Sequence, residues 1–66
     1  MIAFDVKDMS CGHCVSTVMQ AIKGVDRAAT VTIDLARHRV EIEPAAASAQ
    51  ELSEAIAEAG YTPVSA

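Results

Sequence analysis

Met9-Ser10-Cys11-Gly12-His13-Cys14 holds both cysteines of the 66-residue chain and separates two segments of different hydrophobic periodicity. Before it, apolar and polar residues alternate over Ile2–Val6, which is typical of a strand with one buried face. After it, apolar residues recur at helical spacing over His13–Lys23, and Gly24 is a favourable residue for ending a helix. The stretch is therefore predicted to join a first strand to a first helix, with Cys14 in the first helical turn.

A hairpin is predicted downstream of this helix. Apolar residues alternate with polar ones from Ala29 to Leu35 and again over Arg39–Glu43, and Pro44 ends the second run. Only the short turn Leu35–His38 separates the two strands, so their pairing is expected to be antiparallel.

The last third of the sequence predicts a second helix and a short strand. Ser48 and Glu51 have the spacing of a capping box, and Gly60 is expected to stop the helix. Tyr61–Val64 then forms a strand, and Pro63 places that strand at an edge of the sheet because proline cannot donate a hydrogen bond to a neighbour.

The predicted order is therefore βαββαβ. This order indicates an α+β, ferredoxin-like sandwich in which two helices cover one face of a four-stranded antiparallel sheet. Sixty-six residues leave room for one domain with a small core.

Composition narrows the range of functions. The net charge is −4 and the five Lys and Arg residues are scattered, so the chain lacks the basic stripe that nucleic-acid binding requires. Asp5 follows the N-terminus closely, and no apolar run is long enough for a signal peptide or a membrane span. A cytoplasmic location without membrane insertion is expected. In a reducing compartment two close cysteines indicate metal binding or redox chemistry before a structural disulfide.

The cysteine pair is suited to a soft cation. Thiolates select Cu(I), Zn(II), Cd(II) or Hg(II) over hard cations. Structural zinc sites usually have four ligands, whereas this chain has only two cysteines, so the low-coordinate ion Cu(I) is favoured. Because Cys14 lies in the first turn of a helix, its pKa is expected to be below that of a free cysteine.

Met9-x-Cys11-x-x-Cys14 between a strand and a helix resembles the motif of the heavy-metal-associated domain family, particularly its small bacterial cytosolic copper chaperones. The similarity extends over residues 1–66, which it identifies as a single domain, and includes Gly24-Val25 and Gly60-Tyr61. The resemblance implies that Cys11 and Cys14 bind Cu(I) near-linearly. It also implies transfer by ligand exchange to a P-type copper-transporting ATPase, at its metal-binding domain or membrane entry site. Such a protein is not an enzyme.

The resemblance further implies roles for neighbouring residues. Met9 packs under the loop rather than ligating, and Tyr61 lies near the metal. His13 is expected to be an exposed residue at the start of the helix, with ligation as an alternative in a metal-bridged homodimer or with zinc. From the predicted topology, rather than from the resemblance, His38 is expected in the hairpin turn as solvated surface, far from the Met9–Cys14 stretch (the cysteine loop). A copper-responsive regulator is a further partner to consider.

Two alternatives remain open. Cys11-Gly12-His13-Cys14 reads like the active-site loop of protein disulfide isomerases, which would make the chain a thiol–disulfide redox module, although a thioredoxin-like domain needs a longer chain. The same fold and loop also serve sensing, buffering or regulatory domains for zinc, cadmium or mercury, and domains from the N-terminal region of transport ATPases.

Overall fold

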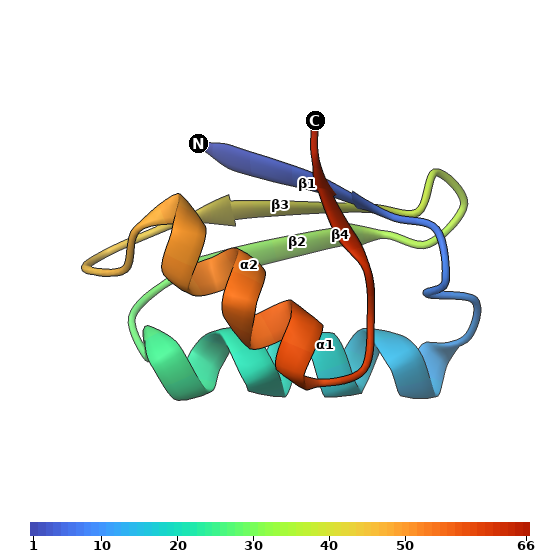
Figure 1. The fold of residues 1–66 in the computed structure, drawn as a ribbon, viewed down its shortest axis with the longest axis horizontal. Coiled ribbons are helices and arrows are strands. Elements are labelled where there is room, and N and C mark those ends of the chain that lie inside the picture. The colour runs from blue at the N-terminus through green and yellow to red at the C-terminus, as the bar shows by residue number, and fades with distance from the viewer.

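Figure 1 shows the fold in a computed structural model that describes residues 1–66. The elements are β1 (Ile2–Val6), α1 (Gly12–Val25), β2 (Thr30–Asp34), β3 (Arg39–Glu43), α2 (Ala49–Glu58) and β4 (Pro63–Ser65). The strands form one antiparallel sheet in the order β2-β3-β1-β4, and both helices lie on one face of it (Figure 1). The predicted ferredoxin-like sandwich is confirmed.

The core lies between the sheet and the two helices. Its strand and helix positions are those that the hydrophobic periodicity predicts, because alternate strand residues and every third or fourth helix residue face the same layer. Fully burying one such side chain stabilises the fold by about 1.5–3 kcal/mol. The side chains that are no more than 2% exposed are Phe4, Val6, Met9, Val18, Ile22, Ala29, Val40, Ile42, Leu52 and Ile56.

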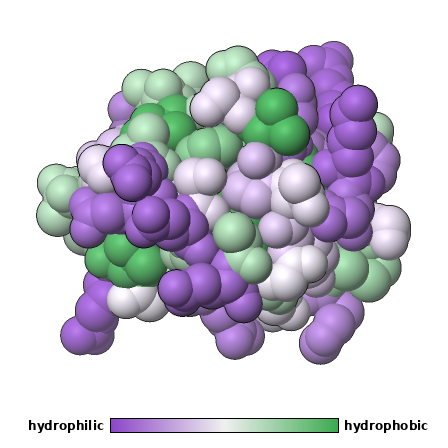
Figure 2. Space-filling model, viewed as in Figure 1, coloured by the Kyte–Doolittle hydropathy of each residue, from purple (hydrophilic) through white to green (hydrophobic).

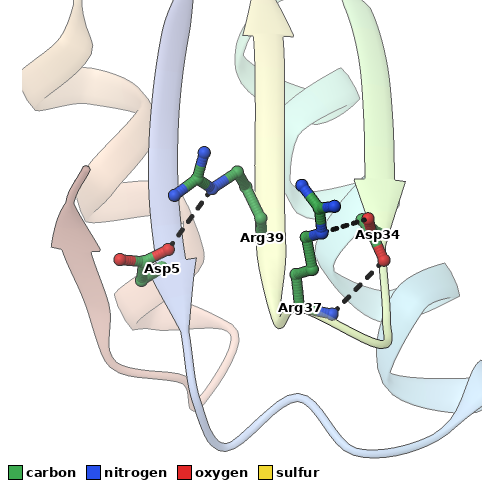
Figure 3. A network of polar contacts seen from close by, with 4 residues as sticks. All are labelled: Asp5, Asp34, Arg37 and Arg39. Atoms are coloured by element: carbon green, nitrogen blue, oxygen red, sulfur yellow. Dashed lines mark hydrogen bonds and ion pairs between the residues drawn. The ribbon is translucent and has the colours of Figure 1, made fainter.

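The opposite face of the sheet carries charged residues. Asp5 of β1 and Arg39 of β3 are register partners, and their side chains approach to 3.5 Å between Oδ1 and Nε (Figure 3). Arg37 and Asp34 form a second pair at 3.7 Å in the adjacent turn. Both pairs are well exposed, so each contributes at most about 1 kcal/mol to stability.

The end of α1 corrects one prediction. Gly24 does not stop the helix, which continues to Val25 and closes with a 2.9 Å hydrogen bond from the N–H of Asp26 to the carbonyl of Ile22. Gly24 lies in the helix without a positive φ. The helix ends at Val25 because the backbone of the next residue, Asp26, is extended.

Asp26 holds the connection that leads into α2. Its side chain is 4% exposed, and its Oδ2 accepts hydrogen bonds from the N–H groups of three consecutive residues. The three donors are Ala45 and Ala46, each at 2.8 Å, and Ala47 at 3.0 Å. These bonds, led by that of Ala46, hold the pKa of the carboxyl below its ordinary value of 3.8.

Both ends of α2 match their predictions. The Ser48 hydroxyl accepts from the N–H of Glu51 at 3.2 Å, and the Glu51 carboxylate accepts from the N–H of Ser48 at 2.9 Å. At the other end Gly60 has a φ of 101°, which favours glycine. The N–H of Gly60 donates to Ala57, and the N–H of Tyr61 donates to Ile56, which is the Schellman arrangement.

The last strand begins later than predicted. Tyr61 and Thr62 lead out of the Schellman turn, and β4 pairs with β1 only from Pro63, opposite Val6. Pro63 does lie in an edge strand, as predicted. Neither helix is long and apolar enough to cross a membrane. Hydrophobic residues appear in Figure 2 only as small separate patches among hydrophilic ones.

Candidate metal centre

The two cysteines meet at the N-terminus of α1. Cys11 is the N-cap residue with an extended backbone, and Cys14 is the third residue of the helix, in its first turn as predicted. Their sulfur atoms are 3.2 Å apart and both thiols are free. Cys11 is exposed and Cys14 is half-buried, so the pair can be reached from solvent on the Cys11 side.

The start of α1 favours negative charge on these sulfurs. The N-cap makes no side-chain hydrogen bond to the helix, and the first turn contains no acidic residue. The first N–H groups of a helix have no partner within it, and the helix dipole adds partial positive charge there. A thiolate at Cys11 or Cys14 can take the place of the missing cap.

Tyr61 reaches the same site from the far end of α2. Its side-chain hydrogen bond to Cys14 is the largest of several contributions that lower the pKa of this thiol from 9.0 to about 7; the backbone of Ser10 and the Cys11 side chain contribute next. The shift has the predicted direction, and its largest cause is the contact with Tyr61. The same contact raises the pKa of Tyr61.

Met9 lies beneath the loop. Its side chain is 0% exposed and belongs to the core, while its N–H donates to the carbonyl of Val6 at 3.1 Å. Burial of an apolar side chain in the middle of the loop ties a polar segment to the core.

The other residues near the pair are exposed. His13 lies between the cysteines on the first turn of α1 with its side chain in solvent. Its carbonyl accepts a 3.0 Å hydrogen bond from the Thr17 hydroxyl. The structure contains no group of three or more His, Cys, Asp or Glu side chains arranged to hold a metal ion.

The prediction for His38 is wrong. The residue is half-buried, and its Nδ1 lies 2.8 Å from the carbonyl oxygen of Met9, inside the cysteine loop. The contact joins residues 29 positions apart, and it depends on how the β2–β3 turn meets the end of β1. The sequence offers one signal, which is that histidine tolerates the left-handed backbone found here, with a φ of 55°.

Comparison with known proteins supports the assignment of the fold and identifies the family. The heavy-metal-associated domain family matches residues 3–62 of the chain. The chain is 35% identical over 60 residues to a protein named copper chaperone CopZ from Enterococcus hirae, covering 88% of this chain and 87% of the relative.

Solved structures of similar proteins have the same fold. A gold-binding protein superposes with a TM-score of 0.93 at 36% identity over the full length of both chains. The copper chaperone Atx1 from Synechocystis PCC6803, in a trimeric His61Tyr form, superposes with a TM-score of 0.92 at 34% identity, covering 97% of this chain and all of the other. With the fold, the paired thiols and these relatives in agreement, the chain belongs to the heavy-metal-associated domain family.

Proposed function

We propose that the chain is a cytoplasmic copper chaperone whose cargo, Cu(I), is bound by the sulfurs of Cys11 and Cys14. The observation that carries the proposal is the free thiol pair, 3.2 Å apart, at the uncapped start of α1. Two thiolates match a soft ion of low coordination number. The named copper chaperone among its relatives supports copper as the ion.

Transfer would proceed by ligand exchange. An incoming thiolate of the partner adds to the bound Cu(I) on the exposed Cys11 side, and a three-coordinate intermediate forms. One cysteine of this chain then leaves and takes up a proton. No bond within a substrate changes and copper stays Cu(I), so the proposed function is not enzymatic.

The partner we propose is a P-type copper-transporting ATPase, at its metal-binding domain or its membrane entry site. A copper-responsive regulator with accessible thiols would suit the same exchange. A metal-bridged homodimer is a third arrangement, in which two exposed Cys11 side chains share ions and His13 comes within reach of the partner copy's metal.

Within the site, Tyr61 and Met9 have supporting roles. The contact between the Tyr61 hydroxyl and Cys14 shields this sulfur and favours its thiolate. The buried Met9 side chain anchors the loop from below, where it cannot reach an ion held on the solvent side without leaving the core.

A competitive Cu(I) titration against a chromophoric chelator tests the proposal. The parent is expected to bind one Cu(I) per chain, and Cys11→Ser/Cys14→Ser is expected to lose binding. Ser16→Ala, an exposed change on the same helix, is the matched control and should bind as the parent does. If the double variant retains the parent's affinity, the proposed site is wrong.

Competing ions and a redox assay separate the alternatives. Zn(II), Cd(II), Hg(II) and Au(I) are titrated against the Cu(I)-loaded protein, because all are soft enough for thiolates and one structural relative is a gold-binding protein. Preference for Zn(II) would favour a regulatory domain. Rapid reduction of insulin disulfides without Cu(I) affinity would favour a redox module.

A further inference from the structure

His38 lies in the turn between β2 and β3, where its main chain contacts β1. Its N–H donates to the carbonyl of Leu35 at 3.3 Å, and its carbonyl accepts from the N–H of Val6 at 2.7 Å. The φ of 55° lies in the left-handed region, which most side chains avoid. These bonds fix the backbone of His38 against the last residue of β1, where the cysteine loop begins.

The imidazole then reaches into the loop itself. Its Nδ1 is 2.8 Å from the carbonyl oxygen of Met9. A carbonyl can only accept, so Nδ1 carries the hydrogen and donates it. Met9 is thus held at three points: its side chain in the core, its N–H on Val6, and its carbonyl on His38.

The hydrogen bond between His38 and Met9 lies close to the metal centre in the chain. Cys11 follows Met9 by two residues and is the exposed member of the thiol pair. A residue this close to a fixed carbonyl has few backbone positions available. Without the hydrogen bond, the Met9 carbonyl would turn to solvent and the backbone of Ser10–Cys11 would gain conformational freedom. Ion binding would then have to order this segment, which costs binding free energy.

We propose that His38 is a positioning residue for the metal centre, because its Nδ1–H holds the Met9 carbonyl and thereby keeps Cys11 beside Cys14. The expected effect of His38 on Cu(I) affinity rests on the proposed function, whereas its effect on the order of the loop does not. The proposal assigns to His38 only this hydrogen bond and no ligation of the ion.

Two substitutions separate the hydrogen bond from the shape of the turn. Asparagine and aspartate both tolerate a positive φ, and each places a polar atom at the same number of bonds from Cα as Nδ1. His38→Asn can donate to the Met9 carbonyl. His38→Asp presents only acceptors to it. The added charge of aspartate is controlled by repeating each measurement at about 1 M salt, where screening is strong.

The first measurement uses the metal-free protein and backbone NMR order parameters. His38→Asp is expected to lower the order parameters of Ser10 and Cys11 while those of Val40 and Ile42 in β3 stay at parent values. His38→Asn is expected to resemble the parent. Nitrogen shifts of the parent imidazole should show hydrogen on Nδ1. Equal loop order in all three proteins, or hydrogen on Nε2 alone, would overturn the proposal.

The second measurement is Cu(I) affinity by chelator competition. His38→Asp should bind roughly two- to tenfold more weakly than the parent, the range that corresponds to one hydrogen bond, and His38→Asn should stay near the parent. Equal losses of Cu(I) affinity in both variants would show that a hydrogen-bond donor at position 38 does not determine the affinity. If the parent itself binds no Cu(I), the proposed function fails, and the order parameters alone still test the positioning of the loop.

Discussion

The side chain of Tyr61, whose N–H closes the Schellman turn of α2, contacts the thiol of Cys14 in the first turn of α1 and favours its charged form. The two residues are brought together by packing of the helices on the same face of the sheet (Figure 1). A hydrogen bond to the charged form of an acid lowers its pKa, and for Cys14 this brings the value to about 7.

Tyr61→Phe removes that donor and is expected to raise the pKa of Cys14 above about 7, toward 9.0. Protons then compete with Cu(I) at higher pH, so the pH profile of Cu(I) affinity should move upward. The pH dependence of alkylation at Cys14, followed by mass spectrometry, measures the pKa directly. Thr62→Ser, at the neighbouring position, is the control and should leave the pKa of Cys14 unchanged. An alkylation profile of Cys14 in Tyr61→Phe that matches the parent's would contradict the prediction.

The same shift links stability to pH. Because folding lowers the pKa of Cys14, ionisation of this thiol stabilises the fold fully above 9.0, and that contribution is lost as pH falls to about 7. Urea unfolding of the metal-free, reduced protein across this range should show the loss. Tyr61→Phe should have a flatter profile over the same interval.

Gly60→Ala tests the turn that places Tyr61. At a φ of 101° a side chain is strained although the surrounding space is open, so the variant should lose about 1–2 kcal/mol of unfolding free energy. Gly24→Ala is the matched control, because Gly24 lies within α1 and also has open space around it. That change should stabilise the protein by about 0.5–1 kcal/mol. Effects of the same sign in both variants would refute this account of the two glycines.

Asp26→Asn tests the buried carboxylate. The variant keeps one acceptor but cannot reproduce an anion that accepts three N–H groups, so it should be clearly less stable than the parent at neutral pH. Because the pKa of Asp26 is lowered in the fold, its contribution is complete above 3.8 and is lost as pH falls through the lower folded value. The stability gap between parent and variant should therefore narrow in acid.

Denaturant unfolding at a series of pH values measures that gap. Glu58→Gln, an exposed change near the end of α2, serves as the control and should change stability little. A gap that stays constant below 3.8 would show that Asp26 acts through shape rather than charge.

Met9 variants distinguish packing from ligation. Met9→Ala should cost about 2–5 kcal/mol because it opens a cavity in a closed core, whereas Met9→Leu nearly conserves volume and should cost less than about 1.5 kcal/mol. Met9→Leu should also keep the parent's Cu(I) stoichiometry and affinity. A large loss of Cu(I) affinity in a well-folded Met9→Leu protein would indicate a thioether ligand.

Most of the fold follows from local patterns in the chain. Alternation over Ile2–Val6 and Arg39–Glu43 sets the buried faces of β1 and β3, and the Ser48–Glu51 capping box sets the start of α2. The spacing of Cys11 and Cys14 at a strand-to-helix junction identifies the candidate metal site. These features involve residues close in sequence, so one-dimensional periodicity and capping rules suffice.

Tertiary structure decides the contacts between residues far apart in the chain. Local rules predict a helix stop at Gly24, but α1 runs to Val25, and the carboxylate of the next residue, Asp26, binds the segment before α2. They likewise leave His38 in solvent, whereas the register of β3 against β1 brings it to the Met9 carbonyl. Asp26 is buried and His38 half-buried in the assembled fold, and polar groups removed from water in this way need a partner. Periodicity carries no information on which distant partner that is.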